Sequence, residues 1–484
     1  MFTHKFQRSG ERSVRPLARY AIVLFFVIGA GAFLMAPPVA RLDGPRVYAI
    51  KDAQIVTGPG KTIPKGTVVF RDGLIIAVGE TAKIPADARV IDGTGLTVYP
   101  GLIDAFGTFG QPAPPAPPAP AGFGNRAAAA ARAQTPQTPE QVHGDPSASA
   151  ADEFKPDETG LEAARFDGFT TELISPPQGI FAGQTSLVDL GSQDVPKMVV
   201  RAPVALTIQF TTARGFGGGI YPVSLMGSVA YIRQTFYDAI HYRDEVARMD
   251  RAKHGVERPE YDKKLAALLP VLKGEMPVIF VADTDTDIHR ALAISDEFKL
   301  KPIIQGAMEG YRVAEMLGTR KIPVIVSLDF PKRQADLPDD VDEPLRILRE
   351  RADAPKCAGK LSAAGVKLAF SSGKLKPDDF IANVRKAVDN GLSKDAAFRA
   401  LTIDAAEILG ASDQLGTIEK GKIANLTVVS GDLFAKDSKV RHVFIDGDEV
   451  ELKKPETPAR RPEGMGTRPG DSGNSGDDTD GRQL

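Results

Sequence analysis

The sequence predicts an α/β fold in which a TIM-like (β/α)8 barrel is inserted into a small composite β-sandwich. Through the middle of the chain, apolar strand-like runs alternate with amphipathic helical segments. At both ends, short β-rich runs are separated by glycine turns. Without the segments that show no periodicity, a body of roughly 370 residues remains, enough for a barrel of about 250 residues and a sandwich.

The first 40 residues have the pattern of an export segment. Ala21–Ala36 is an uncharged apolar run of 16 residues that follows five Lys or Arg residues. This pattern is typical of a signal peptide, and the run is shorter than the about 20 residues of a spanning helix. A cleaved signal peptide and a retained N-terminal membrane anchor both stay open. In either case the positive-inside rule places the body outside the cytoplasm, periplasmic or membrane-anchored.

The two ends of the body have β character. Residues 46–99 hold short alternating runs, and Asp72-Gly73 is a hairpin-turn signal between two of them. Residues 412–452 return to the same pattern, with a second Asp-Gly turn. We therefore predict one β-sandwich domain assembled from residues 46–99 and 412–452.

Residues 100–411 are predicted to form the barrel. Four apolar runs there are predicted strands, at Pro277–Ala282, Lys301–Gly306, Ile322–Leu328 and Val366–Ser371. Helices are predicted over Asp287–Phe298 and Pro377–Asp389. A helical apolar stripe is formed by Val229, Ile232, Phe236 and Ile240. Strands joined by helices in this way indicate a parallel sheet.

Two stretches have compositions that bury too little apolar surface to fold. Residues 109–152 are rich in Pro, Ala and Gln, and residues 453–484 in Pro, Gly, Ser and Asp. We predict a disordered insert in the barrel and a disordered C-terminal tail.

Composition excludes some functions. The net charge is −2, from 60 Lys and Arg against 62 Asp and Glu, which disfavours nucleic acid as a partner. The single cysteine, Cys357, can form neither an internal disulfide nor a thiolate zinc site. The six histidines are scattered, without an HxH or HxxxH pair.

Several motifs between Arg46 and Leu452 occur in the order found in one known family. They are GTVVFRDGLIIAVG, VIDGTGLTVYPGLIDAFGT, GFTTELISP and LSKDAAFRALTIDAAEILGASDQLGTIEKGKIANLTVV. With these motifs the chain resembles the amidohydrolase superfamily, closest to its imidazolonepropionase-like branch. The resemblance implies a barrel hydrolase that acts on non-peptide carbon–nitrogen bonds in cyclic amides, N-acyl amino acids and dipeptides. It also implies Zn or another divalent metal that activates water.

The metal ligands that the resemblance implies are absent from their positions. PGLID is intact, but the two histidine positions that follow it are Phe106 and Thr108. Two later histidine positions are Val281 and Gly306, and the metal-binding aspartate position is Ser372. Loss of a residue that only orients a ligand already costs about 10- to 100-fold in affinity or activity, and loss of several ligands costs more. We expect neither bound metal nor another cofactor, and the catalytic residues stay undefined.

Polar residues near the predicted strand ends are candidate ligand-binding groups, namely Asp104, Glu172, Asp283, Gln305, Glu309 and Ser371. The Asp283, Asp285 and Asp287 series suits a hard cation such as Ca²⁺, but equally suits the N-terminus of the following helix. Ser371 and Ser372 lack the sequence context of a nucleophilic serine.

Two hypotheses follow for function. The first is an amidohydrolase-like pseudoenzyme outside the cytoplasm, which binds a small molecule or pairs with a second copy or an active relative. The alternative is an active amidohydrolase with an atypical site built from Asp104, Asp283, Glu309 or Ser372. In a third possibility, a partner chain supplies the missing groups.

Overall fold

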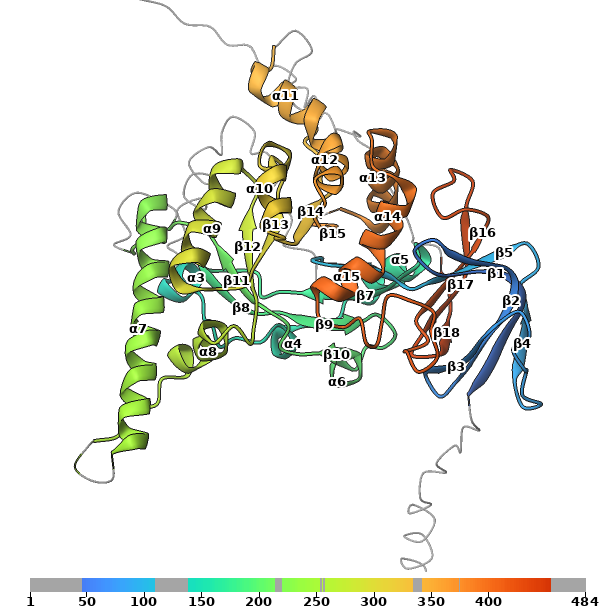
Figure 1. The fold of residues 1–484 in the computed structure, drawn as a ribbon, viewed down its shortest axis with the longest axis horizontal. Coiled ribbons are helices and arrows are strands. Elements are labelled where there is room, and N and C mark those ends of the chain that lie inside the picture. The colour runs from blue at the N-terminus through green and yellow to red at the C-terminus, as the bar shows by residue number, and fades with distance from the viewer. Residues whose placement is uncertain are drawn as a thin grey trace, which may run out of the picture. The chain divides into compact units, whose positions relative to one another are not determined.

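The computed structural model describes residues 46–108, 138–213, 220–252, 255, 257–333, 342–373 and 375–453 (Figure 1). The predicted export segment, residues 109–137 of the insert and residues 454–484 of the tail lie outside them. Within the described ranges, no helix is long and apolar enough to cross a membrane. The strands of these ranges form three sheets, of eight, four and six strands.

The eight-stranded sheet is built from both ends of the chain. Its strands are β1 (Val47–Gly58), β2 (Lys61–Arg71), β3 (Leu74–Gly79), β4 (Arg89–Asp92), β5 (Leu96–Pro100), β16 (Leu426–Ser430), β17 (Lys439–Ile445) and β18 (Asp448–Val450). They run in the order β18-β17-β16-β5-β1-β2-β3, with β4 on β1. The predicted hairpin turn is confirmed, because Asp72 (φ 47°) and Gly73 (φ 88°) join β2 to β3 in the left-handed conformation of such turns.

The six-stranded sheet contains all four predicted barrel strands. Its members are β8 (Phe181–Gln184), β11 (Leu206–Gln209), β12 (Val278–Ala282), β13 (Pro302–Gly306), β14 (Val324–Ser327) and β15 (Leu368–Ser371). From β11 to β15 neighbouring strands are parallel, and β8 is antiparallel to β11. Most residues of β12 to β15 are buried, as expected for strands covered on both faces.

The four-stranded sheet makes this region mixed rather than fully parallel. It contains β6 (Leu102–Asp104), β7 (Phe169–Ile174), β9 (Ser186–Asp189) and β10 (Val199–Arg201). β6 and β7 are parallel, whereas β9 is antiparallel to both β7 and β10. The connections around β8 to β10 are too short for a helical crossover, so these strands cannot all be parallel. The Ala105 N–H donates to Phe370 O at 2.9 Å and places the end of β6 beside β15.

Helices connect and cover these sheets (Figure 1). They are α3 (Pro139–His143), α4 (Ala150–Glu153), α5 (Glu158–Phe166), α6 (Val195–Met198), α7 (Leu225–Arg251), α8 (Lys263–Leu272), α9 (Asp285–Phe298), α10 (Ala314–Thr319), α11 (Leu345–Asp353), α12 (Cys357–Ala363), α13 (Pro377–Asp389), α14 (Lys394–Leu401) and α15 (Ile403–Ile408), with the 3₁₀ turns η1 (Gly310–Arg312) and η2 (Ala354–Lys356). The predicted ranges of α9 and α13 are confirmed, α9 beginning two residues earlier. On α7 the predicted stripe faces the core through Ile232 and Phe236.

The predicted disorder of residues 109–152 is wrong for its last part, because residues 138–152 are ordered. Thr138 and Gln141 form a capping box that starts α3. Val142 is buried, and its carbonyl accepts from Ile180 N at 2.9 Å, beside β8. The Pro- and Ala-rich composition hid this short segment, whose order comes from contacts with residues far along the chain.

Asn425 joins three parts of the fold. Its Oδ1 accepts from Asp446 N at 2.8 Å, in the turn between β17 and β18. Its Nδ2 donates to Thr171 Oγ1 of β7 at 3.3 Å, and its backbone oxygen accepts from Gly101 N at 2.8 Å. The Asn425 side chain is buried, and its hydrogen bonds connect the eight-stranded sheet to β7.

Replacement of Asn425 by alanine is expected to lower the free energy of unfolding by about 1–3 kcal/mol, because it leaves buried partners without hydrogen bonds. Chemical denaturation measures the change. Asn390→Ala is the control, since Asn390 is exposed and bonds only within its own helix end. Equal stability losses in the two variants would contradict the role of Asn425.

Candidate ligand-binding site

The five positions that the resemblance assigns to metal ligands lie at or just beyond strand ends. Phe106 and Thr108 follow β6, and Ser372 follows β15. Val281 is the next-to-last residue of β12, and Gly306 is the last residue of β13. Gly306 is in register with Ala282, the last residue of β12. Barrel folds place their sites at such ends.

Polar groups at the ends of β6, β13 and β15 are hydrogen-bonded to one another. Ser371 is fully buried, and its Oγ donates to Phe106 O at 2.5 Å. The same oxygen accepts from Gln305 Nε2 at 3.4 Å and from Gly373 N at 3.1 Å. Thr108 Oγ1 donates to Gly373 O at 3.1 Å. The structure therefore brings together the candidates Gln305 and Ser371 with the segment that follows β6.

Two fully buried carboxyl groups lie beside this network. Asp104 of β6 and Glu172 of β7 are partners in the strand register, and neither is exposed. Asp104 Oδ1 accepts from Phe106 N at 3.2 Å and from Ser372 N at 3.1 Å. Among the described residues, no hydrogen bond of good geometry reaches Asp104 Oδ2 or Ser372 Oγ, although both atoms are buried.

Gly107 closes this cluster and cannot be replaced without displacing it. A Cβ at Gly107 would lie 1.9 Å from Asp104 Oδ2 and 2.8 Å from Glu172 Oε1. Both carboxyl groups therefore face the bare backbone of Gly107. Gly107 was not among the predicted site residues, and its only signal in the sequence was a glycine close after the PGLID motif, three residues beyond the end of β6.

Burial raises the pKa of Asp104 to about 6, and hydrogen bonds from Ser372 and the Phe106 backbone oppose that rise. Desolvation disfavours the charged form of a carboxyl group, whereas donors favour it. A carboxyl group that titrates near pH 6 can hold or release a proton under physiological conditions.

The candidate Glu309 follows β13 and bonds to the start of α9, whereas the candidate Asp283 lies directly after β12 and before the N-cap of that helix. Thr284 is the N-cap and accepts from Asp287 N at 3.1 Å, while Glu309 Oε2 accepts from Asp285 N at 3.2 Å. Arg312 pairs with Glu309 at 3.3 Å. Burial of the Asp283 carboxyl group raises its pKa, and the nearby negative charge of Asp287 raises it further. These contacts agree with the helix-capping interpretation, and Thr284 is the capping residue.

The described residues contain no group of three or more His, Cys, Asp or Glu side chains arranged to hold a metal ion. The four described histidines belong to helices or to the eight-stranded sheet. His143 Nε2 lies 2.6 Å from Tyr221 O, and its ring stacks on Tyr231. His442 Nδ1 lies 2.8 Å from Glu449 Oε1, and His241 and His289 are exposed on α7 and α9.

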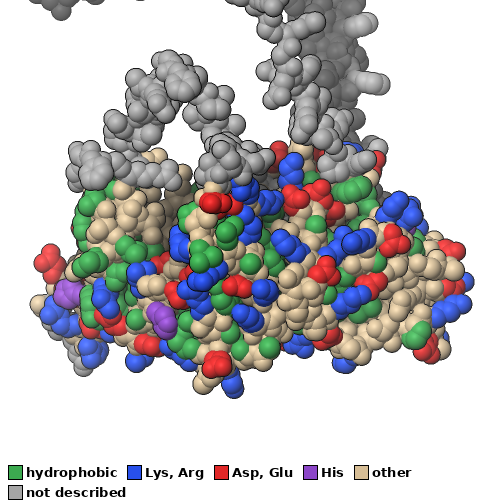
Figure 2. All heavy atoms as spheres, turned by 90° about the horizontal axis from the view of Figure 1, so that it is seen from above, with side chains coloured by type: hydrophobic (Ala, Val, Ile, Leu, Met, Phe, Trp, Pro, Cys, Tyr) green, Lys and Arg blue, Asp and Glu red, His purple; other side chains and the backbone are tan. Residues whose placement is uncertain are grey.

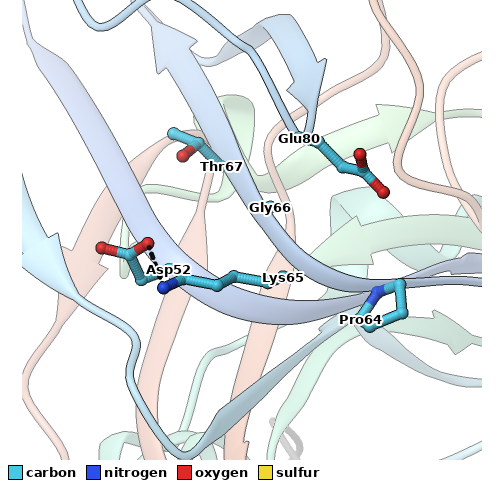
Figure 3. Close-up of a pocket in the computed structure, with 6 residues that line it drawn as sticks. All are labelled: Asp52, Pro64, Lys65, Gly66, Thr67 and Glu80. Carbon is cyan, nitrogen blue, oxygen red and sulfur yellow. Dashed lines mark ion pairs between the residues drawn. The ribbon is translucent and has the colours of Figure 1, made fainter.

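A separate open hollow of about 370 Å³ lies on the eight-stranded sheet (Figure 3). Its lining residues are Asp52, Pro64, Lys65, Gly66, Thr67 and Glu80. Lys65 Nζ lies 3.2 Å from Asp52 Oδ1, and its hydrogen bond lowers the pKa of Asp52. None of the predicted site residues lines this hollow, so its size alone does not make it the functional site.

Surface charge is mixed. Figure 2 shows Lys and Arg side chains interspersed with Asp and Glu over the visible face, without a broad region of one sign. That distribution agrees with the net charge of −2.

These observations describe an α/β protein whose polar candidate site lies at strand ends and in which strands from residues 47–100 and 426–450 share one sheet. A family model described as the amidohydrolase family matches residues 319–450. A solved amidohydrolase from Thermotoga maritima MSB8 is 27% identical with a TM-score of 0.67, over 84% of this chain and 100% of that one. A solved Xaa-Pro dipeptidase with bound methionine is 17% identical with a TM-score of 0.50, over 84% and 100%. No curated protein matches the chain.

By these comparisons the chain is similar to proteins of the amidohydrolase superfamily. Its solved relatives imply an α/β fold that contains a TIM barrel.

Asp104→Asn is expected to make the free energy of unfolding depend less on pH than it does in the wild type. The native state raises the pKa of Asp104 to about 6, so the native state binds this proton more tightly than the unfolded state does. The stability that the protonated Asp104 contributes is therefore complete below about pH 4 and is lost as the pH rises through 6. Relative to the wild type, the variant should gain up to about 3 kcal/mol at pH 8 and nothing at pH 4.

Denaturant unfolding from pH 4 to 8 tests this expectation. Burial also raises the pKa of Asp167 to about 7 and of Asp189 to about 8, so the wild type should lose stability over the whole range. The difference between variant and wild type isolates Asp104. Asp250→Asn, on an exposed part of α7, is the control. A pH-independent difference for Asp104→Asn would show that this carboxyl group does not titrate in the range.

Proposed function

We propose that this chain is a non-hydrolytic member of the amidohydrolase superfamily that binds a small polar molecule at its strand ends without a metal ion. The observation that carries the proposal is the hydrogen-bond network there. Ser371 binds the Phe106 carbonyl and Thr108 binds the Gly373 carbonyl, so protein groups bond to one another at these positions. We propose for the same chain a (β/α)8 barrel inserted into a composite β-sandwich.

The residues present do not fit the metal that the family implies. The Phe106 side chain has no atom able to coordinate a metal, and Thr108 Oγ1 donates to a backbone carbonyl. At Gly306 the backbone has φ 97°, and a Cβ would lie 2.2 Å from Asp283 Oδ1. A histidine there would need a strained backbone and a displaced carboxylate. No step of a reaction is therefore assigned to a metal.

The chemistry of the site favours a ligand with hydrogen-bond donors. Asp104 and Glu172 are acceptors when ionised, and Gln305 and Ser372 offer an amide and a hydroxyl group. Cyclic amides, N-acyl amino acids and dipeptides, the compound classes implied by the resemblance, carry N–H donors and carbonyl acceptors. Thr108, which is exposed, forms the outer border of this cluster.

One observation supports the alternative of an active hydrolase with an atypical site. A carboxyl group with a pKa of about 6, such as Asp104, suits a general acid or base near neutral pH. Ser372 is its direct neighbour through the backbone hydrogen bond at 3.1 Å. Glu309 bonds to the start of α9, and the backbone oxygen of Asp283 accepts from Glu309 N, so these contacts give neither residue a bond to Asp104 or Ser372.

We also propose that the protein is exported and that its partner is a small molecule. The apolar run Ala21–Ala36 after a basic segment supports export, with the body periplasmic or anchored to a membrane. A small molecule is the proposed ligand. The mixed charge supports the exclusion of nucleic acid as a partner.

Elemental analysis and activity assays of the full chain test the proposal. We expect no stoichiometric divalent metal and no hydrolysis of N-acyl amino acids, Xaa-Pro dipeptides or cyclic imides with added Zn²⁺ or Mn²⁺. One of these classes should raise the melting temperature, because a ligand at 100 times its Kd stabilises by about 2.7 kcal/mol. Gln305→Ala should abolish that shift, and Glu80→Gln in the separate hollow should leave it. Stoichiometric metal with metal-dependent turnover would overturn the proposal.

Restoring the five family ligands together is expected to fail. The variant Phe106→His, Thr108→His, Val281→His, Gly306→His and Ser372→Asp should bind Zn²⁺ no better than the wild type, measured by isothermal titration. The physical reason is the conflict of a side chain at residue 306 with Asp283 and with its own backbone. The same variant without Gly306→His is the control for folding. Tight, stoichiometric zinc binding by the five-residue variant would show that only the ligands had been lost.

A further inference from the structure

A buried apolar cluster is shared by the six-stranded and the four-stranded sheets. Its strand residues include Ile103, Leu173, Leu187, Ile279, Ile303, Ile325 and Ala369. Their chain neighbours Phe280, Ile304 and Phe370 belong instead to the larger core, together with buried residues of the helices. Successive side chains of a strand point to opposite faces. One face of these strands is therefore turned toward the shared cluster, and we call it the inner face.

Uncharged residues continue the inner face of the six-stranded sheet beyond this cluster. Each of the following lies two residues after a cluster residue, on β12, β13, β14 and β15 in turn: Val281, Gln305, Ser327 and Ser371. Gln209 of β11 is in register with Val281. Side chains two residues apart on a strand share a face. These residues, which we call the inner layer, therefore place amide, hydroxyl and apolar groups near the C-terminal ends of the strands.

The ring of Phe106 packs against the same apolar cluster, just beyond the end of β6. Phe106 is partly exposed, as are Gln209 and Val281 of the inner layer. Ser371 Oγ donates to Phe106 O at 2.5 Å and ties Phe106 to this layer. Because Asp104 is fully buried, an approaching ligand meets the partly exposed groups first. They combine an aromatic face with amide donors and acceptors, as small-molecule sites commonly do.

Two carboxylates border the inner layer. Asp329 follows β14, its N–H donates to Ser327 Oγ at 3.3 Å, and a Cβ at Gly373 would lie 3.9 Å from Asp329 Cβ. Asp283 follows β12, and a Cβ at Gly306 would lie 2.2 Å from Asp283 Oδ1. Both carboxylates thus lie beside strand ends that carry inner-layer residues. A ligand carboxylate bound there would meet like charges, which lower affinity and exclude such ligands.

The arginines that follow β13 and β14 already have carboxylate partners. Arg312 lies 3.3 Å from Glu309, and Arg333 lies 3.6 Å from Glu343. A ligand carboxylate would therefore compete with a protein carboxylate for either arginine. Lys332 is exposed, and ion pairs of exposed lysines contribute little to binding because water screens them. These cations do not offset the carboxylates that border the inner layer.

We propose that Phe106 and the inner layer select an uncharged, planar amide or imide and reject ligands that carry a carboxylate. This inference rests on the proposed function, a site for a small polar molecule, and names the compound class. The Phe106 ring stacks on the plane of the ligand. Gln209 and Gln305 bind its N–H and carbonyl groups, because a primary amide offers a donor beside an acceptor. Of the classes that the resemblance implies, cyclic amides meet these conditions, whereas N-acyl amino acids and dipeptides carry a carboxylate.

Isothermal titration of the full chain at neutral pH with matched probes tests the ligand class. Phthalimide, a planar imide, should bind about two- to tenfold more tightly than its saturated, non-planar analogue hexahydrophthalimide, the factor expected for aromatic stacking. 4-Carbamoylphthalimide should bind at least about tenfold more tightly than 4-carboxyphthalimide, because like charges repel the acid. The last two probes have nearly the same shape, so the comparison isolates the charge.

Substitutions test the residues named. Phe106→Leu should weaken phthalimide binding about two- to tenfold, and Phe106→Tyr, which keeps a ring, should bind as the wild type does. Gln209→Leu should also weaken binding about two- to tenfold, through a lost hydrogen bond. The matched controls are Phe434→Leu, at a partly exposed phenylalanine after β16, and Gln234→Leu, on the exposed side of α7. Both should bind phthalimide unchanged, and the melting temperatures of the unliganded variants report their folding.

Three results would overturn this inference. The first is binding of 4-carboxyphthalimide as tight as that of the carbamoyl probe. The second is equal binding of phthalimide by the wild type and a folded Phe106→Leu variant, which would remove the stacking role. The third is the absence of binding by every imide. Metal-dependent turnover would overturn the proposed non-hydrolytic function alone, because equilibrium binding of the charged and uncharged probes still decides the compound class.

Discussion

The hydrogen bond from Gly101 N to Asn425 O, 2.8 Å long, joins the two points at which the chain enters and leaves its central region. Beside it, β5 and β16 pair antiparallel, with Pro100 opposite Leu426. More than 300 residues are thus contained between two neighbouring strands of one sheet. Everything at the strand ends depends on this closure, because β6 begins directly after Gly101 and positions Asp104.

The placement of Asp104 sets the electrostatics of the site. Its strand neighbour is Glu172, and both are fully buried. Desolvation of the Asp104 carboxyl group disfavours its ionised form and raises its pKa to about 6. Backbone donors from Phe106 and Ser372 offset part of this desolvation for Asp104. At mildly acidic pH the Asp104 carboxyl group of this cluster is therefore largely protonated.

Much of the fold was predictable because its signals are local. Alternating strands, the Asp72-Gly73 turn and the helical period of Pro377–Asp389 are written in neighbouring residues. The order of residues 138–152 was not, since it depends on contacts between Val142 and the β8 region. The antiparallel strands β8 to β10 also escaped prediction, because their register follows from pairing partners distant in sequence.

For the site, the sequence located the strand ends but not the contacts between them. Asp104, Glu172, Gln305 and Ser371 converge because β6, β7, β13 and β15 end near one another. Glu309 looked equivalent in the sequence, yet it bonds to the start of α9. The difference lies in side-chain direction, which residue type and strand position alone do not define.

The close approach of Asp283 to Gly306 links two neighbouring strand ends in their tolerance of substitution. A side chain at residue 306 would meet the Asp283 carboxylate and would need a backbone of positive φ. A substitution at the end of β13 is therefore expected to displace the residue that follows β12, so changes at positions 283 and 306 depend on one another.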